Sequence, residues 1–149
     1  MTPYDMIKAQ MKAAIPFAAH VGVELADIGE GTATARLPET AQTQNHIGSQ
    51  HAGAMFTLGE AASGAAMAGG FLPVIQKLRP VAAGARIKYV KVARGALLAE
   101  ATLEGVAADH LKTLEADGKV SVTVEITIRD SENDPVAEMA VDWYLSFTR

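Results

Sequence analysis

The chain has 149 residues, of which 49% are hydrophobic and 20% charged, and its net charge is −4. This length is enough for one domain with a core and too short for two, so we expect a single domain over residues 1–149. An acidic balance without a basic stripe is not typical of a nucleic-acid-binding protein, and the absence of cysteine excludes disulfides, thiolate nucleophiles and cysteine-based zinc sites.

The first residues predict a short amphipathic helix. Thr2 stands before a proline, as is typical of a helix start, and Ile7, Met11 and Ile15 then recur at helical spacing as far as residue 16. The segment lacks the continuous apolar stretch of a signal peptide, and no part of the chain is apolar for long enough to span a membrane. We therefore expect a cytoplasmic protein without a membrane partner.

A hairpin and a polar loop follow. Residues 21–28 and 32–37 predict the two arms of the hairpin, and the glycines of 29–31 predict its turn. Residues 39–50 are mostly polar and have short side chains, which is typical of a loop.

The next segment predicts a long helix from His51 to Ala68, ended by Gly69 and Gly70. Its residues are small or apolar on every side, and Glu60 is its only carboxylate. A helix that is apolar all round must be surrounded by protein, so we expect an antiparallel sheet to curl around it.

The second half of the chain predicts four strands. Residues 71–84 read as a connector with two prolines, and residues 85–92 are expected to pair with residues 96–107 through a turn at Arg94 and Gly95.

An undecided segment and two further predicted strands complete the chain. Residues 108–118 are either a helical turn or an irregular excursion. Residues 119–130 alternate, with valine or isoleucine at each even position from 120 to 128, and residues 135–147 form the closing strand after a turn.

Residues 45–64 carry a resemblance to a known family. "NHIGSQHAGAMFTLGEAASG" resembles the signature segment of the hotdog-fold acyl-CoA thioesterases, in the branch of the phenylacetate-pathway and 4-hydroxybenzoyl-CoA thioesterases. "IKYVKVARG" is similar to that family's strand ending in a basic, glycine-bounded turn, and the order of elements agrees over residues 21–147. The resemblance implies an α+β hotdog fold, an antiparallel sheet curled around one long central helix, here with a short N-terminal helix.

The same resemblance implies an activity. It is hydrolysis of an acyl-CoA thioester to the free acid and CoA, without a cofactor, at sites between the subunits of a homodimer or homotetramer.

Glu60 and Gly53 are the leading catalytic candidates. An ionised carboxylate away from water costs several kcal/mol unless it is paired, so Glu60 is interpreted as a general base or nucleophile. Gly53 lies at the helix start, where backbone N–H groups are free and the dipole favours negative charge, so its N–H is expected to polarise the thioester carbonyl. The alternative for Glu60 is an ion pair with a neighbouring strand or an exit at a subunit seam.

Asn45 and His51 complete the catalytic set that the resemblance implies. Asn45 would orient the water or the carboxylate, usually that of the partner subunit, and His51 would donate to a carbonyl or hold the loop. The alternatives are an ordinary turn asparagine and a helix cap. His46 is a weaker candidate; it is not spaced with His51 as a metal pair and no carboxylate joins them, so no metal site is expected.

Ala54 and Ser63 are expected to contact the substrate. The chain departs from the family at Ala52, where the family often has glycine, and at Ala82, where related enzymes often carry a hydroxyl. Ser63 would supply that hydroxyl, or it is a small residue for helix packing.

Three basic residues lie where the resemblance places the nucleotide end of CoA: Lys88, Lys91 and Arg94. They would meet its phosphates. The alternative is a solvated strand edge whose lysines prevent aggregation.

Two further functions stay open. A non-catalytic acyl-CoA-binding module is compatible with the altered turn and the missing hydroxyl. A hotdog dehydratase or hydratase also uses a histidine and an acid, but the proline-containing turn expected of the fatty-acid dehydratase type is absent, so it ranks last.

Overall fold

The computed structural model describes all 149 residues, and it begins with two helices rather than one. The first, α1 (Pro3–Ala14), is the predicted helix, and at its start the side chains of Thr2 and Asp5 accept hydrogen bonds from each other's backbone N–H groups. The second, α2 (Pro16–Val21), corrects the prediction that the first hairpin arm begins at residue 21. Proline at the first helical position starts α2 instead of only ending α1, and Gly22, with φ of 100°, ends it in the left-handed conformation.

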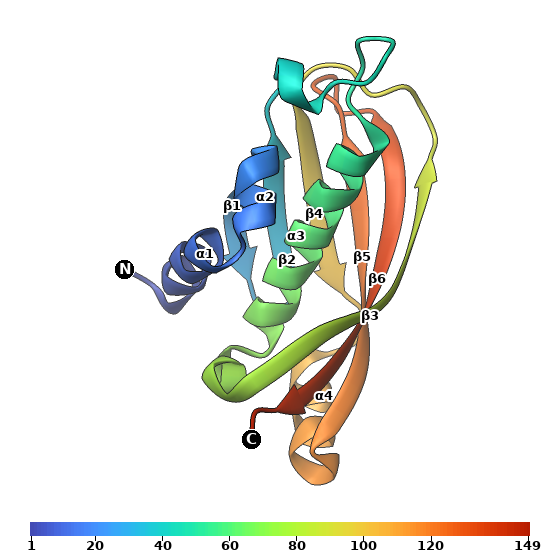
Figure 1. The fold of residues 1–149 in the computed structure, drawn as a ribbon. Coiled ribbons are helices and arrows are strands. Elements are labelled where there is room, and N and C mark those ends of the chain that lie inside the picture. Colours follow the sequence, from blue (N-terminus) through green and yellow to red (C-terminus); the bar gives the residue numbers. More distant parts are fainter.

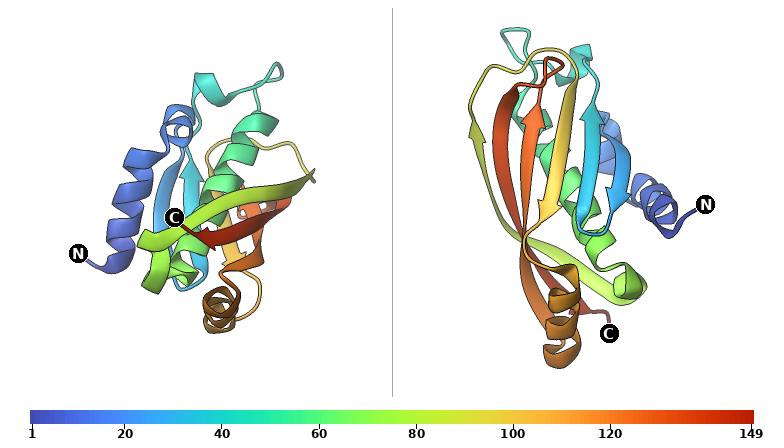
Figure 2. Two further views of the ribbon diagram at one scale, coloured as in Figure 1. Left: turned by 60° about the horizontal axis from the view of Figure 1, so that its bottom comes forward. Right: turned by 180° about the vertical axis from the view of Figure 1, so that it is seen from behind.

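Six antiparallel strands form one sheet. Their bounds are β1 (Glu24–Gly29), β2 (Thr32–Leu37), β3 (Leu78–Tyr89), β4 (Leu97–Leu103), β5 (Lys119–Arg129) and β6 (Pro135–Phe147). The strand order is β1-β2-β4-β5-β6-β3, and the sheet curls around the helix α3 (Ala52–Gly70), as Figures 1 and 2 show. The predicted α+β architecture, with a short N-terminal helix and one long central helix, is confirmed.

The central helix α3 is enclosed by protein. Of its 19 residues, 15 are buried. The prediction that Gly69 and Gly70 end it is wrong by two residues, because both lie within the helix and Phe71 is its C-cap. Glycine is required at position 69 for close packing and not for a turn. A side chain there would strike the backbone carbonyl of Gly29.

The predicted pairing of the third and fourth strands is also wrong. β3 begins at Leu78, inside the predicted connector, and it pairs with β6 over 11 residue pairs. β4 lies instead between β2 and β5. Arg94 and Gly95 therefore belong to a connection from one edge of the sheet to its interior and not to a hairpin turn.

The remaining elements are short. Residues 108–118, predicted as either a helical turn or an irregular excursion, belong to the helix α4 (Ala107–Asp117) and its C-cap. This helix extends beyond one end of the sheet (Figure 2). Single 3-10 segments lie at Ala41–Thr43 and Leu72–Lys77.

The core lies between α3 and the inner face of the sheet. The even-numbered residues of β5 from Val120 to Ile128 all point into it, as their alternation predicts. Opposite them α3 presents mostly alanine, so the helix backbone approaches the strands closely. The N-terminal helices cover another side of α3, where α1 contacts both α3 and β1. This arrangement leaves one flank of α3 under α1 instead of under the sheet, and that flank carries Glu60.

Candidate functional site

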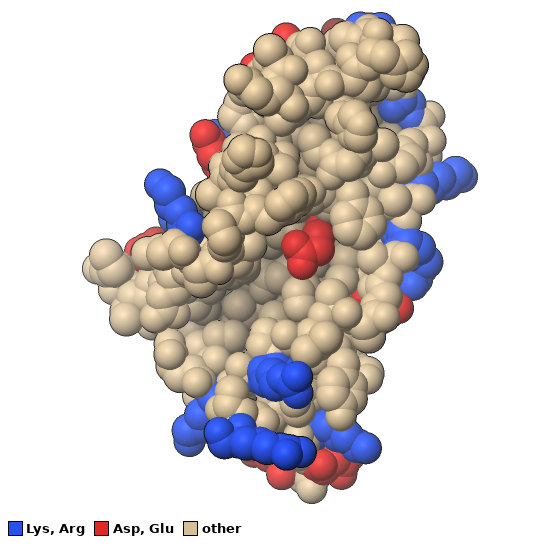
Figure 3. Space-filling model, in the orientation of Figure 1, with Lys and Arg blue, Asp and Glu red and all other residues tan.

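Glu60 projects from the third turn of α3 without a partner. Its carboxylate accepts no hydrogen bond from the protein and forms no ion pair, so the predicted alternative of an ion pair with a neighbouring strand does not occur within the chain. The residue is half-buried, and burial raises the pKa of its carboxyl. Figure 3 shows an acidic group surrounded by uncharged, hollowed surface over α3, whose only acidic residue is Glu60.

Glu60 lines a mostly apolar cavity of about 190 Å³. Met11 of α1 and Ile15, which links α1 to α2, form one wall of this cavity, and β6 contributes Trp143. The side of α3 that faces it is small, with Ala61 and Gly64 next to the carboxylate. A carboxylate in such surroundings is less well solvated than in water, which favours proton uptake and makes it a candidate base.

The start of α3 is a second part of the site. The Nδ1 atom of His51 accepts a hydrogen bond of 2.8 Å from the N–H of Gly53, so His51 is the helix cap that the sequence leaves as one alternative. A side chain at Gly53 would approach this imidazole to 3.1 Å, which explains the glycine. The N–H of Gly53 is thus engaged, while the N–H groups of Ala52 and Ala54 have no acceptor in the chain.

Gly53 and Glu60 do not line the same pocket. Gly53 borders a separate pocket of about 280 Å³ together with His51, Ala54 and Thr57. Seven residues of helix separate the two by about 10 Å along the axis. A single chain therefore holds two half-sites, a carboxylate and a helix start with free N–H groups.

Asn45 holds its own loop. Its Oδ1 accepts hydrogen bonds from the N–H groups of Ile47 and Ser49 at 3.0 and 3.1 Å, and its Nδ2 donates to the Ser49 hydroxyl at 2.8 Å. It also borders a surface pocket of about 480 Å³ between this loop and the end of β3. The structure therefore places Asn45 at a pocket and uses most of its hydrogen-bonding capacity for the turn.

Two residues that the sequence analysis did not single out fix this region. The Tyr89 hydroxyl donates to the carbonyl of Ala52 at 2.9 Å, which ties the end of β3 to the first turn of α3. The buried Gln50 donates to the Gly95 carbonyl at 2.9 Å and accepts from the Thr43 hydroxyl at 2.8 Å. Nothing in the local sequence marks these residues, because both bridge segments that are distant along the chain.

Ser63 is a packing residue in this structure. It is fully buried, its hydroxyl donates to the Glu60 carbonyl at 2.7 Å, and it accepts from the Trp143 indole N–H at 3.2 Å. These contacts agree with the packing alternative, and contact of Ser63 with a substrate stays a prediction. Ala82, which stands where related enzymes often carry a hydroxyl, lies in β3 opposite Trp143.

The three basic residues differ in their surroundings. Lys91 donates to Asp134 at 2.9 Å and to Asp130 at 3.3 Å, and these hydrogen bonds raise the pKa of its amine. Lys88 and Arg94 are exposed and form no ion pair. Of the three, Lys91 alone is paired with carboxylates of its own chain, and contact of these residues with a phosphate stays a prediction.

No group of three or more histidine or acidic side chains is placed to hold a metal ion. None of the helices combines the length and the apolar character that a membrane crossing needs.

Comparison with solved structures identifies the fold. A Pseudomonas aeruginosa protein of unknown function, named a probable thioesterase, is 25% identical and superposes with a TM-score of 0.81, over 99% of this chain and 97% of that one. The Escherichia coli PaaI protein from the phenylacetic acid degradation operon is 21% identical, with a TM-score of 0.73 over 95% of this chain and 92% of that one. A thioesterase family protein from Silicibacter pomeroyi is 15% identical, with a TM-score of 0.78 over 97% and 99% of the two chains. The fold is therefore the hotdog fold of the thioesterase superfamily, as the resemblance implies.

Sequence comparison adds a match to a family model. Residues 4–145 match the family described as Domain of unknown function (DUF4442). A search of curated proteins finds no match.

Proposed function

The chain belongs to the DUF4442 family, and from that premise and its hotdog fold we propose that it hydrolyses a thioester, specifically an acyl-CoA, to the free acid and CoA. One observation carries the proposal: Glu60 is a half-buried carboxylate without a partner, and it faces an apolar cavity. An unpaired carboxylate in such a place costs folding free energy, so its presence favours a chemical role. The solved structure named a probable thioesterase supports the reaction class.

Glu60 acts as the general base or the nucleophile. As a base it takes a proton from water, which attacks the thioester carbonyl carbon; as a nucleophile its oxygen attacks that carbon directly. In both cases the carbonyl oxygen gains negative charge, the carbon–sulfur bond breaks, and the CoA thiolate leaves and takes up a proton. In the nucleophilic route water then hydrolyses the anhydride between Glu60 and the acyl group, which frees the acid and restores the carboxylate. The first turn of α3 supplies donors for that charge: the free N–H of Ala54, and the N–H of Gly53 once the His51 ring turns away.

The two half-sites meet across a subunit interface. Because Glu60 and Gly53 line different pockets in one chain, we place the Glu60 of one subunit against the first turn of the partner's α3. β3 supplies a surface for such a partner: its outer edge has no neighbouring strand, and Val81 and Tyr89 on it are 43% and 45% exposed. His51 and Asn45 then act from the helix start and its loop, and Ala54, Lys88 and Arg94 contact the thioester and the nucleotide.

The assembly is tested by light scattering on the purified chain. We expect a homodimer or a homotetramer. A substitution that blocks the β3 edge, Ala85→Pro, should lower the oligomeric state and the activity together, because the N–H of Ala85 faces away from β6 and proline cannot donate to a neighbouring strand. A wild-type monomer that hydrolyses acyl-CoA at full rate would contradict the composite site.

The activity is tested with a panel of acyl-CoAs and a thiol reagent. Because the chain has no cysteine, released CoA is the only thiol that the reagent reads. We expect Glu60→Gln to lower kcat/KM by about 100-fold or more, as for loss of a general base. The matched control is Glu30→Gln, an exposed acid in the β1–β2 turn, which should keep the wild-type rate.

The outcomes separate the alternatives. Hydrolysis by Glu60→Gln at the wild-type rate would overturn the proposed role of Glu60. Tight binding of acyl-CoAs without turnover of any of them would identify a binding module instead.

A further inference from the structure

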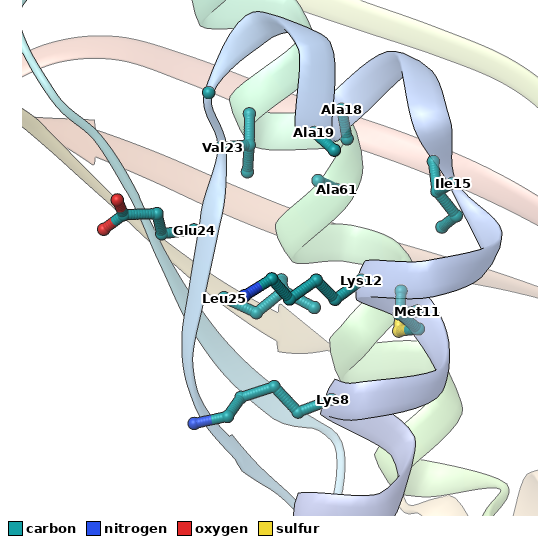
Figure 4. A pocket seen from close by; sticks show the side chains of 11 residues that line it. Lys8, Met11, Lys12, Ile15, Ala18, Ala19, Val23, Glu24, Leu25 and Ala61 are labelled. Atoms are coloured by element: carbon teal, nitrogen blue, oxygen red, sulfur yellow. The ribbon is translucent and has the colours of Figure 1, made fainter.

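Another pocket, of about 510 Å³, lies beneath the N-terminal helices (Figure 4). Its walls come from α1, α2, α3 and the start of β1 with the two residues before it. They are mostly apolar, and the apolar side chains on them are Met11, Ile15, Ala18, Ala19, Val23, Leu25 and Ala61. Nothing in the proposed chemistry uses this pocket.

The pocket adjoins the cavity of Glu60. Met11, Ile15 and Ala61 line both of them. Ala61 directly follows Glu60 in the chain, and the residues of α2 line only the larger pocket. Of the shared residues, Ala61 has only a methyl group and Met11 has a flexible side chain, so the boundary between the two spaces is made of side chains that can give way to a ligand.

The charged residues of this pocket lie at its outer side. Lys8 donates to the carbonyl of Ala26 at 3.2 Å, which links α1 to β1. Figure 4 shows Lys8 and Lys12 reaching from α1 toward β1, while the carboxylate of Glu24 points away from the apolar side chains. The lysine stems extend the apolar wall, and the Lys8 amine is engaged by the backbone of β1. Apolar side chains thus make up most of the lining, which favours an aliphatic group over a sugar, a base or a phosphate.

We propose that this pocket holds the tail of a long aliphatic acyl group whose thioester carbonyl lies at Glu60. The inference rests on the proposed function and names its substrate class. An aryl or short acyl group would end within the cavity of about 190 Å³ at Glu60, whereas a long chain passes Ala61 and continues beneath α2. Aliphatic chains gain from this path because each buried methylene contributes a roughly constant transfer free energy.

The test compares acyl chain lengths in pocket variants. For the wild type, kcat/KM should rise from butyryl-CoA through octanoyl-CoA to dodecanoyl-CoA, by up to about fourfold per methylene. Ala18→Leu fills the far end of the pocket and should lower the ratio of dodecanoyl-CoA to butyryl-CoA kcat/KM at least tenfold. Ala19→Leu, on the same wall, repeats the test if Ala18→Leu does not fold. Ala13→Leu makes the same change on α1 outside the pocket and should keep the wild-type ratio.

A binding measurement separates this proposal from the proposed function. Calorimetry with dodecanoyl-CoA on Glu60→Gln protein, with and without Ala18→Leu, reads the pocket without turnover, and Ala18→Leu should weaken binding at least tenfold. Loss of binding in the double variant with no hydrolysis by the wild type would overturn the proposed function and keep the pocket. Hydrolysis whose chain-length ratio is unchanged in both Ala18→Leu and Ala19→Leu would overturn the pocket and keep the function.

Discussion

The two sides of α3 use small residues for opposite purposes. On the side that faces the sheet, Ala62, Ala65 and Ala66 are fully buried, and Gly69 lies against the backbone carbonyl of Gly29. On the side that faces α1, the small residues Ala61 and Gly64 border the cavity of Glu60. Smallness is required where backbones touch, whereas on the other side it leaves space for a ligand. The same substitution on the two sides should therefore have opposite effects on stability.

The largest effect is expected for Gly69→Ala. The new methyl group would overlap the backbone carbonyl oxygen of Gly29 and approach Ile28 Cγ2 to 3.1 Å. Backbone of β1 cannot move away without disturbing the sheet, so we expect the free energy of unfolding to fall by about 3 kcal/mol. Urea unfolding at one fixed protein concentration measures it. A loss below about 1 kcal/mol would show that the sheet side is not constrained by backbone contact.

The sequence predicts one side of α3 better than the other. The apolar composition of α3 is enough to predict that protein encloses this helix, because it has no polar face to present to solvent. The alternation of β5 predicts which residues of the strand pack against the helix. The occupant of the other side is not predictable from local pattern. Ile7, Met11 and Ile15 predict an apolar helix face, but periodicity does not say which surface covers that face. The wall of the Glu60 cavity is thus a long-range contact.

The same limit explains the error at β3. An alternating strand pairs equally well with many others, so the local pattern of residues 85–92 does not reveal β6 as the partner. For the candidate site, the composition of the helix singles out Glu60. That Gly53 donates to His51, and that Ser63 bonds to Trp143, depends on side-chain positions that no spacing rule supplies.

A smaller effect is expected from the charge on the cavity side. Burial raises the pKa of Glu60 above its ordinary value of 4.5, so between the two values the folded chain binds more protons than the unfolded one. The free energy of unfolding should therefore fall as the pH rises through this window. Glu60→Gln lacks this titration and should be more stable than the wild type at neutral pH, with the gap closing below pH 4.5.

The measurement is thermal unfolding from acid to neutral pH. Glu30→Gln at the exposed turn should follow the wild type throughout. A gap between Glu60→Gln and the wild type that stays constant with pH would mean that lost packing, and not the ionised carboxylate, sets the difference.

The smallest effect, and the one of opposite sign, is expected for Gly64→Ala. The added methyl group would lie 3.5 Å from Met11 Cε and 3.5 Å from Trp143 Cζ2, which are ordinary van der Waals distances. Alanine is more favourable than glycine within a helix by about 1 kcal/mol, so the free energy of unfolding should rise by up to that amount. Urea unfolding beside Gly69→Ala makes the comparison direct, because both substitutions add one methyl group to the same helix. A loss of stability at Gly64 as large as at Gly69 would show that α1 packs on α3 as tightly as the sheet does, and that the cavity at Glu60 is not open space held for a ligand.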